Sequence, residues 1–185
     1  MRFVIELLCF AAVELTATTW LMAGQKDADK PGQPTEKKEN VVQATYLITG
    51  LHCPPCTTTV EQSLRRTPGI RSVKVDWRTH NARIEFDENA VSAQKVALLV
   101  NRTPHMMGGG MRYGGWLSLR VTGVKDEATA KKAKETLAGI KGVTSVVVYP
   151  AQEAVGIAFS DSGEITTKQL IQSLADTGLA ATSIP

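Results

Sequence analysis

The stretch VVQATYLITGLHCPPCTTTVEQSLRR, residues 41–66, changes its hydrophobic period part-way along. Its first part is rich in β-branched residues, and Tyr46 and Ile48 alternate with threonines, which predicts a strand. Pro54 and Pro55 suit the entrance of a helix, where the amide hydrogens that proline lacks would have no partner, and apolar residues then recur four positions apart. A strand, a loop and a helix are therefore expected, and the loop GLHCPPC carries two cysteines.

The residues after this helix continue the pattern. We expect Val73, Val75 and Trp77 on one side of the second strand, because this segment alternates in polarity. Strand, helix, strand, strand, helix, strand is the ferredoxin-like order, an α+β fold with an antiparallel sheet and both helices on one face. The predicted elements are strands at 71–77 and 82–86, a helix at 92–100 and a short last strand at 105–107.

The same framework recurs in the second part of the chain. A shift of 73 positions places Gly123 on Gly50 and Ile157 on Ile84. A repeat of about 70 residues has the size of a small domain. The chain is therefore predicted to hold two tandem ferredoxin-like domains, at residues 41–107 and 116–185, joined by a glycine-rich linker at 108–115.

The N-terminal segment has the outline of a secretory signal. Residues 1–24 start with Arg2, continue with an apolar body and end in small residues, although Glu6 and Glu14 interrupt the body. An uncleaved anchor and a cytosolic amphipathic tail remain alternatives. Residues 25–40 have no large apolar side chain and are predicted to be a disordered linker. We therefore expect a secreted or periplasmic protein, with membrane attachment only through an uncleaved N-terminus.

Composition excludes several classes of function. The net charge is +3 and aromatic residues make up 5% of the chain, so neither a basic surface nor stacking platforms indicate nucleic-acid binding. No catalytic triad, paired carboxylates or phosphate-binding loop is present, so we do not expect an enzyme. Three cysteines, of which Cys9 lies in the N-terminal segment, are too few for a disulfide framework.

Cys53 and Cys56 are the main candidates for chemistry. The start of a helix stabilises a thiolate, and thiolates are soft ligands for Cu(I), Zn(II) and Hg(II). Two sulfurs do not complete a tetrahedral zinc site, whereas Cu(I) tolerates low coordination and can be passed to a partner. The same pair could also act as a redox dithiol, or be inert.

The segments GLHCPPCTTTVEQSL, PGIRSVKVDW and ARIEF resemble the heavy-metal-associated domain of copper chaperones, mercury-binding periplasmic proteins and metal-pumping ATPases. The resemblance covers residues 44–107. It implies a ferredoxin-like fold, a metal held by Cys53 and Cys56, and a metal-donor or acceptor partner such as a metal-transporting ATPase. Leu51 stands where the family usually has methionine, beneath the loop, and is a near-isosteric replacement.

The second repeat resembles this family in its framework only. Asp126 and Thr129 occupy the motif positions and offer no soft ligand, so we expect no comparable metal site there. Such a degenerate domain could dock a partner or act as a spacer.

Other residues are weaker candidates. His52 could assist the metal, and His105 falls where relatives carry Tyr, Lys, Phe or His, in a loop expected to return beside the cysteines. The glycine run is flanked by Met106, Met107 and Met111. These residues suggest a thioether site for Cu(I), although strand and linker roles also explain them. His80 is expected in a hairpin turn without a functional role.

Three functional hypotheses follow. The leading one is capture, buffering or transfer of a soft metal ion, most readily Cu(I), with Zn(II) or Hg(II) as other candidates. A thiol-disulfide redox protein using the same cysteines is the second. An interaction module that docks a partner, with metal only as a regulator, is the third.

Overall fold

The computed structural model describes residues 39–185. The predicted signal segment at 1–24, Cys9 and all but the end of the predicted linker at 25–40 lie outside the described residues. The elements are β1 (Val41–Thr49), α1 (Pro54–Arg65), β2 (Ile70–Asp76), β3 (Asn81–Asp87), α2 (Ala93–Arg102), β4 (Gly114–Thr122), α3 (Glu127–Ala138), β5 (Val143–Tyr149), β6 (Ala154–Phe159), α4 (Thr167–Asp176) and β7 (Ala180–Ser183).

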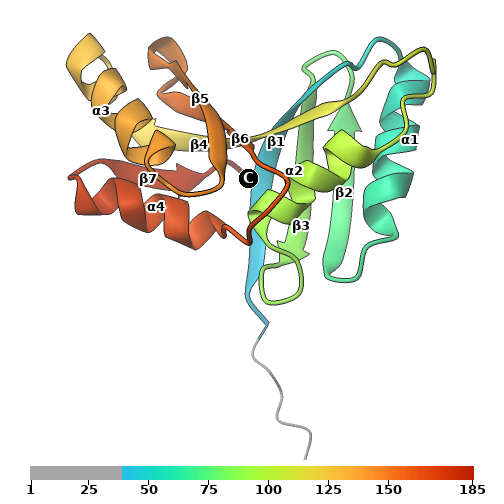
Figure 1. The fold of residues 1–185 in the computed structure, drawn as a ribbon, viewed down its shortest axis with the longest axis horizontal. Helices are drawn as coiled ribbons and strands as arrows, with labels where there is room; N and C mark the ends of the chain where they lie inside the picture. Colours follow the sequence, from blue (N-terminus) through green and yellow to red (C-terminus); the bar gives the residue numbers. More distant parts are fainter. Residues whose placement is uncertain (1–38) are drawn as a thin grey trace, which may run out of the picture. The chain divides into compact units, whose positions relative to one another are not determined.

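The first half has the predicted order of strands and helices, and all elements except the last strand have boundaries close to those expected. β3 lies between β1 and β2 and pairs antiparallel with both. Helix α1 packs on β2, helix α2 packs on β4, and the two helices contact each other (Figure 1). The α1 residues Val60 and Leu64 are fully buried, as their four-residue spacing indicates. This half is an α+β, ferredoxin-like arrangement.

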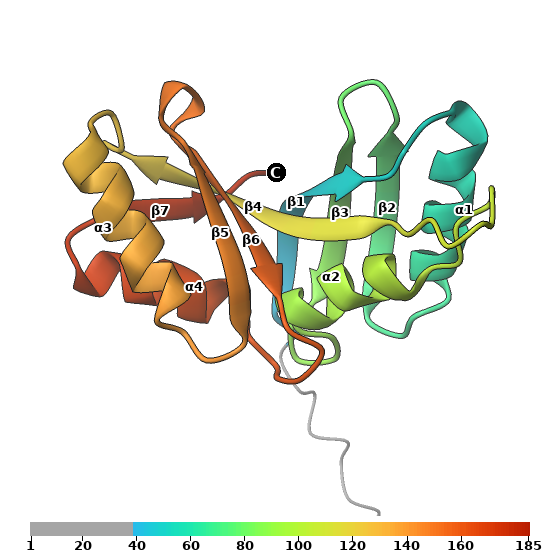
Figure 2. The same cartoon turned by 45° about the horizontal axis from the view of Figure 1, so that its top comes forward.

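Strand β4 takes part in both halves of the sheet (Figure 2). Its first residues, from Gly114 to Ser118, pair with β1, and its last, from Leu119 to Thr122, pair with β7. Strand β6 pairs with the other edge of β4, and all these pairings are antiparallel. The described strands form one seven-stranded sheet in the order β2-β3-β1-β4-β6-β5, with β7 beside β4.

The predicted last strand at 105–107 is wrong. These residues lie in a loop, and the strand that completes the first half begins at Gly114. Gly115 explains the difference, because a Cβ at this position would lie 2.8 Å from the carbonyl oxygen of Ala97 in α2. Glycine here lets the strand approach the helix closely, whereas the sequence pattern suggested only a flexible linker.

Trp77 also departs from the prediction. Strand β2 ends at Asp76, whose carboxylate accepts a hydrogen bond from the backbone N–H of Arg78 at 2.8 Å. The chain therefore turns before Trp77, whose side chain is exposed, whereas Val73 and Val75 are buried. A turn stabilised by an aspartate side chain has ended the alternation one residue early.

The second half repeats the topology, with α3 packed on β5 and α4 packed on β7. Side chains from the first half reach it. The Gln94 amide donates to the carbonyl of Ser160 at 2.9 Å and accepts from the backbone N–H of Ile165 at 3.1 Å. Glu88 accepts from the first N–H of α4, that of Thr167, at 2.5 Å. Division into two tandem domains stays a prediction, because the halves share β4 and these hydrogen bonds.

In the part of the chain that the structure describes, no helix combines the length and apolar character needed to cross a membrane.

Candidate metal centre

The two cysteines of GLHCPPC lie side by side at the start of α1. Cys53 is the N-cap residue, with extended backbone angles (φ −158°, ψ 160°), and its side chain makes no capping hydrogen bond. Cys56 lies in the first helical turn, and its N–H donates to the Cys53 carbonyl at 3.1 Å. The two Sγ atoms are 3.1 Å apart. The predicted pair is therefore brought together, with Cys53 half-buried and Cys56 buried.

The two thiols differ in acidity. Burial raises the pKa of Cys56, but hydrogen bonds from the His52 backbone and the Cys53 thiol, together with the nearby Tyr113 hydroxyl, outweigh it and lower the pKa to about 7. The pKa of Cys53 is raised, chiefly because its thiol hydrogen-bonds to Cys56. In the metal-free protein, Cys56 is thus the more easily ionised sulfur, and Cys53 keeps its proton.

Tyr113, just before β4, is a residue of the site that the sequence did not reveal. Its side chain is buried, and its hydroxyl has no hydrogen-bond partner at ordinary geometry within residues 39–185. Burial and its interaction with Cys56 raise the pKa of Tyr113 to about 12. A Cys56 thiolate is the acceptor that this hydroxyl can serve. The sequence predicts His105, eight residues earlier, at the position where relatives carry Tyr, Lys, Phe or His, and gives no sign of Tyr113.

His105 returns beside the cysteine loop, as expected for the segment after α2. Its Nε2 donates to the Gly50 carbonyl at 2.9 Å, and its Nδ1 accepts from the Met107 N–H at 3.2 Å. The ring also lies 4.4 Å from the Tyr113 ring, measured between centroids. Both ring nitrogens are thus engaged, and the ligand role predicted for His105 would require one of these hydrogen bonds to break.

His52 and Leu51 border the cysteines on the other side. The His52 side chain is exposed, and its ring centroid lies 5.8 Å from that of His105. Its backbone N–H lowers the pKa of Cys56, an effect that does not depend on the imidazole ring. Leu51 is buried at the foot of the loop, where the sequence placed it. An auxiliary metal role for the His52 ring stays a prediction.

Met106 brings a further sulfur beside the pair, with its Sδ 4.0 Å from Cys53 Sγ. Met107 and Met111 are exposed in the same loop. Between residues 39 and 185, no group of three or more histidine, cysteine, aspartate or glutamate side chains is placed to hold a metal.

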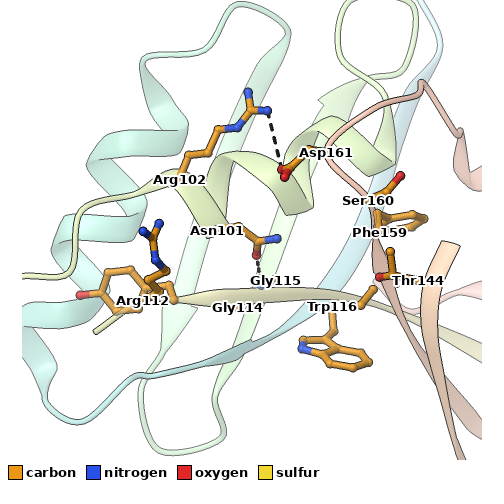
Figure 3. Close-up of a pocket in the computed structure, with 12 residues that line it drawn as sticks. Asn101, Arg102, Arg112, Gly114, Gly115, Trp116, Thr144, Phe159, Ser160 and Asp161 are labelled. Carbon is orange, nitrogen blue, oxygen red and sulfur yellow. Dashed lines mark hydrogen bonds and ion pairs between the residues drawn. The ribbon is translucent and has the colours of Figure 1, made fainter. Parts of the chain in front are cut away.

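An open pocket of about 930 Å³ is lined in part by Tyr113 and has neither cysteine in its lining. Figure 3 shows the Asn101 side chain directed at the backbone of Gly115, whose N–H it accepts at 2.7 Å. At the rim, Arg102 faces Asp161, with 3.8 Å between the charged atoms. The Asn101 hydrogen bond ties the start of β4 to α2, and therefore supports the backbone that carries Tyr113.

The second half has no such pair of thiols. Asp126 is the N-cap residue of α3, and its carboxylate accepts from the backbone N–H of Thr129 at 2.8 Å. The motif position in this repeat therefore caps a helix.

Comparison with known proteins agrees with this geometry. The model of the heavy-metal-associated domain matches residues 45–100. The copper chaperone CopZ of Staphylococcus haemolyticus is 33% identical over 56 residues, which are 30% of this chain and 82% of the chaperone. The chain belongs to the heavy-metal-associated domain family.

Longer matches extend over both halves of this family member. A copper-transporting ATPase of Oryza sativa, HMA5, is 25% identical over 154 residues, which are 80% of this chain and 15% of the ATPase. The chain thus spans a small part of the length of such relatives. Among solved structures, the water-soluble region of the P-type ATPase CopA from Bacillus subtilis covers 78% of this chain and 92% of its own, with 18% identity and a TM-score of 0.39.

Proposed function

We propose that the protein binds Cu(I) through Cys53 and Cys56 and passes the ion to a partner. The observation that supports this most strongly is a pair of sulfurs 3.1 Å apart at the uncapped start of α1, one of them with a pKa of about 7. A thiolate is a soft ligand that suits Cu(I). Zn(II) and Hg(II) are further candidates for the same sulfurs.

Capture of the ion would require movement at Cys53. A metal–sulfur bond is about 2.3 Å, so two sulfurs on opposite sides of one ion are about 4.6 Å apart. The thiols, at 3.1 Å, must therefore separate as the ion enters. Cys56 is held by the helix, whereas Cys53 is half-buried in the preceding loop and is the sulfur that can swing outward.

Transfer to a partner fits an accessible loop. His52, Pro54 and Pro55 are exposed around Cys53, so a second protein could bring its own ligands to this sulfur. The relatives described above are named as a copper chaperone and a copper-transporting ATPase. We therefore propose a metal donor or acceptor, such as a metal-transporting ATPase, as the partner.

Two further proposals concern the rest of the chain. The second half would be a degenerate, metal-free domain used for docking or spacing, since Asp126 caps α3 where a ligand would stand. Residues 1–24 would direct the protein to a secreted or periplasmic location, and the thiols would there have to be kept reduced or already metallated.

Thiol-disulfide exchange is the second candidate function. It is favoured by the same Sγ–Sγ distance and by the pKa of about 7 at Cys56, which provides an attacking thiolate at neutral pH. The buried position of Cys56 favours it less, because the attacking sulfur must reach a disulfide in another molecule.

Titration of the reduced full-length protein with Cu(I) against a competing chelator separates the two functions. We expect one tightly held ion per chain, lost in the double variant Cys53→Ser/Cys56→Ser and retained in the matched control Cys9→Ser. Micromolar or weaker affinity, together with turnover of a disulfide substrate, would contradict metal transfer and support the redox function.

A further inference from the structure

The loop between α2 and β4 carries three of the five methionines of the chain, and we name residues 104–112 the methionine loop. An isolated β-bridge between Pro104 and Arg112 closes its base. At its tip, Gly108, Gly109 and Gly110 all have positive φ, between 63° and 78°, where side chains would be strained. The loop is therefore closed at its base and has a defined backbone conformation at its tip.

Two contacts hold this loop against the cysteine loop. The His105 ring donates to the carbonyl of Gly50, and Gly50 itself packs so closely on Arg112 that a Cβ would lie 2.6 Å from its carbonyl oxygen. The same ring accepts from the Met107 N–H at 3.2 Å. Met106 lies between His105 and Met107, so its backbone position relative to the cysteines is set from both sides.

The distance from Met106 to the cysteines suits a shared ion. With metal–sulfur bonds of about 2.3 Å, two sulfurs of a trigonal site are about 4.0 Å apart. Met106 Sδ lies 4.0 Å from Cys53 Sγ, so this edge of a three-sulfur site is already in place. The edge from Cys53 to Cys56 measures 3.1 Å and would have to open by about 0.9 Å to match.

Packing gives no other reason for a methionine at this position. The Met106 side chain is 48% exposed, so it does not fill a gap in the core, which is the usual structural use of methionine. A thioether is soft and uncharged and has no proton to lose, so it favours Cu(I) and offers little to Zn(II). It would also be a weaker ligand than a thiolate, and a partner's cysteine could displace it.

We propose that Met106 supplies a third, thioether ligand to the Cu(I) held by Cys53 and Cys56, and thereby makes the site selective for Cu(I) over Zn(II). This assignment rests on the proposed metal-binding function. The methionine loop would thus complete the coordination of the ion. His105 would position the loop, and its ring would not bind the metal.

The variant Met106→Leu tests the assignment, because leucine has a similar volume and lacks the sulfur. In the full-length reduced protein, we expect its Cu(I) affinity to fall about tenfold, the lower end of what supporting groups contribute to metal sites. Its Zn(II) affinity should not change. The matched control is Met107→Leu, a neighbouring and more exposed methionine, which should leave both affinities at the wild-type values.

A spectroscopic measurement identifies the ligand directly. In selenomethionine-labelled protein carrying Met107→Leu and Met111→Leu, X-ray absorption at the selenium edge should show a copper–selenium contact, and this contact should vanish when Met106→Leu is added. Tight, cysteine-dependent Cu(I) binding without any copper–selenium contact would overturn the role of Met106 and leave the proposed function intact. Failure of the wild-type protein to bind Cu(I) would overturn both.

Discussion

The two halves of the chain use the same backbone arrangement for different purposes. Cys53 and Asp126 are both N-cap residues with extended backbone angles, at the starts of α1 and α3. The Asp126 carboxylate accepts the Thr129 N–H at 2.8 Å, whereas the Cys53 side chain makes no capping bond. The first helix therefore gives up an ordinary source of stability, and its first turn stays free to stabilise a thiolate and bind an ion.

The surroundings of the two positions differ as well. Cys56 is buried, with the Tyr113 hydroxyl beside it, while its counterpart Thr129 is only partly buried. The Tyr113 hydroxyl comes from the segment that follows α2. The corresponding segment after α4 is the short strand β7, near the end of the chain as given. Loss of the thiols and loss of the covering loop thus go together in the second half.

Exchange of the motif residues should have the largest effect. In the variant Cys53→Asp/Cys56→Thr, the first half receives the pair that the second half has. We expect Cu(I) affinity to fall by roughly 1,000-fold or more, about 4 kcal/mol, because no thiolate remains. Chelator competition measures the loss, and circular dichroism should show an intact fold. Retention of tight binding would show that the ion is held elsewhere.

The dependence of Cu(I) affinity on pH should be the next largest effect. Below pH 7 both thiols are protonated, so binding releases two protons and affinity should fall about 100-fold for each unit of acidification. Above the Cys56 pKa of about 7, only Cys53 still carries a proton. The slope should then be about tenfold per unit, until the raised pKa of Cys53 is passed.

Chelator competition at a series of pH values, corrected for the chelator's own protonation, measures this bend. The variant Tyr113→Phe is the control, because removal of the hydroxyl donor raises the pKa of Cys56 and should shift the bend to higher pH. A single slope through neutral pH in the wild-type protein would mean that Cys56 is not the more acidic thiol.

The smallest effect concerns helix capping. Asp126→Ala removes the side-chain cap of α3 and should lower the free energy of unfolding by about 1 kcal/mol. Cys53→Ala removes no cap from α1, so its effect should be clearly smaller. Urea unfolding of the reduced, metal-free protein compares the two variants. Equal losses would indicate that Cys53 does stabilise the start of α1, contrary to the geometry.

Agreement between sequence and structure follows the range of the interactions involved. The first three strands and both helices of the first half match the sequence prediction to within a few residues, because apolar periodicity and helix entry at Pro54 and Pro55 are local signals. The last strand was misplaced because glycine signals either flexibility or close packing. Only the contact of Gly115 with Ala97 shows that packing is the case here.

The site divides in the same way. Spacing and the helix that follows identify Cys53 and Cys56, whereas Tyr113 lies 57 residues beyond Cys56 and within the predicted linker at 108–115. The sequence predicts a thioether site for Cu(I) among the methionines, but nothing in it distinguishes Met106 from Met107. The distance from Met106 Sδ to Cys53 Sγ distinguishes them.

The amino-acid sequence alone determines the order of the elements, the start of α1 at two prolines, and the two thiols at its N-cap and in its first turn. These features depend on residues within a few positions of one another. The tertiary structure decides which distant groups surround the thiols, because Tyr113 and Met106 reach them only when Gly114 to Ser118 pair with β1 and His105 binds Gly50. Those contacts join segments more than 50 residues apart, and no local pattern specifies them.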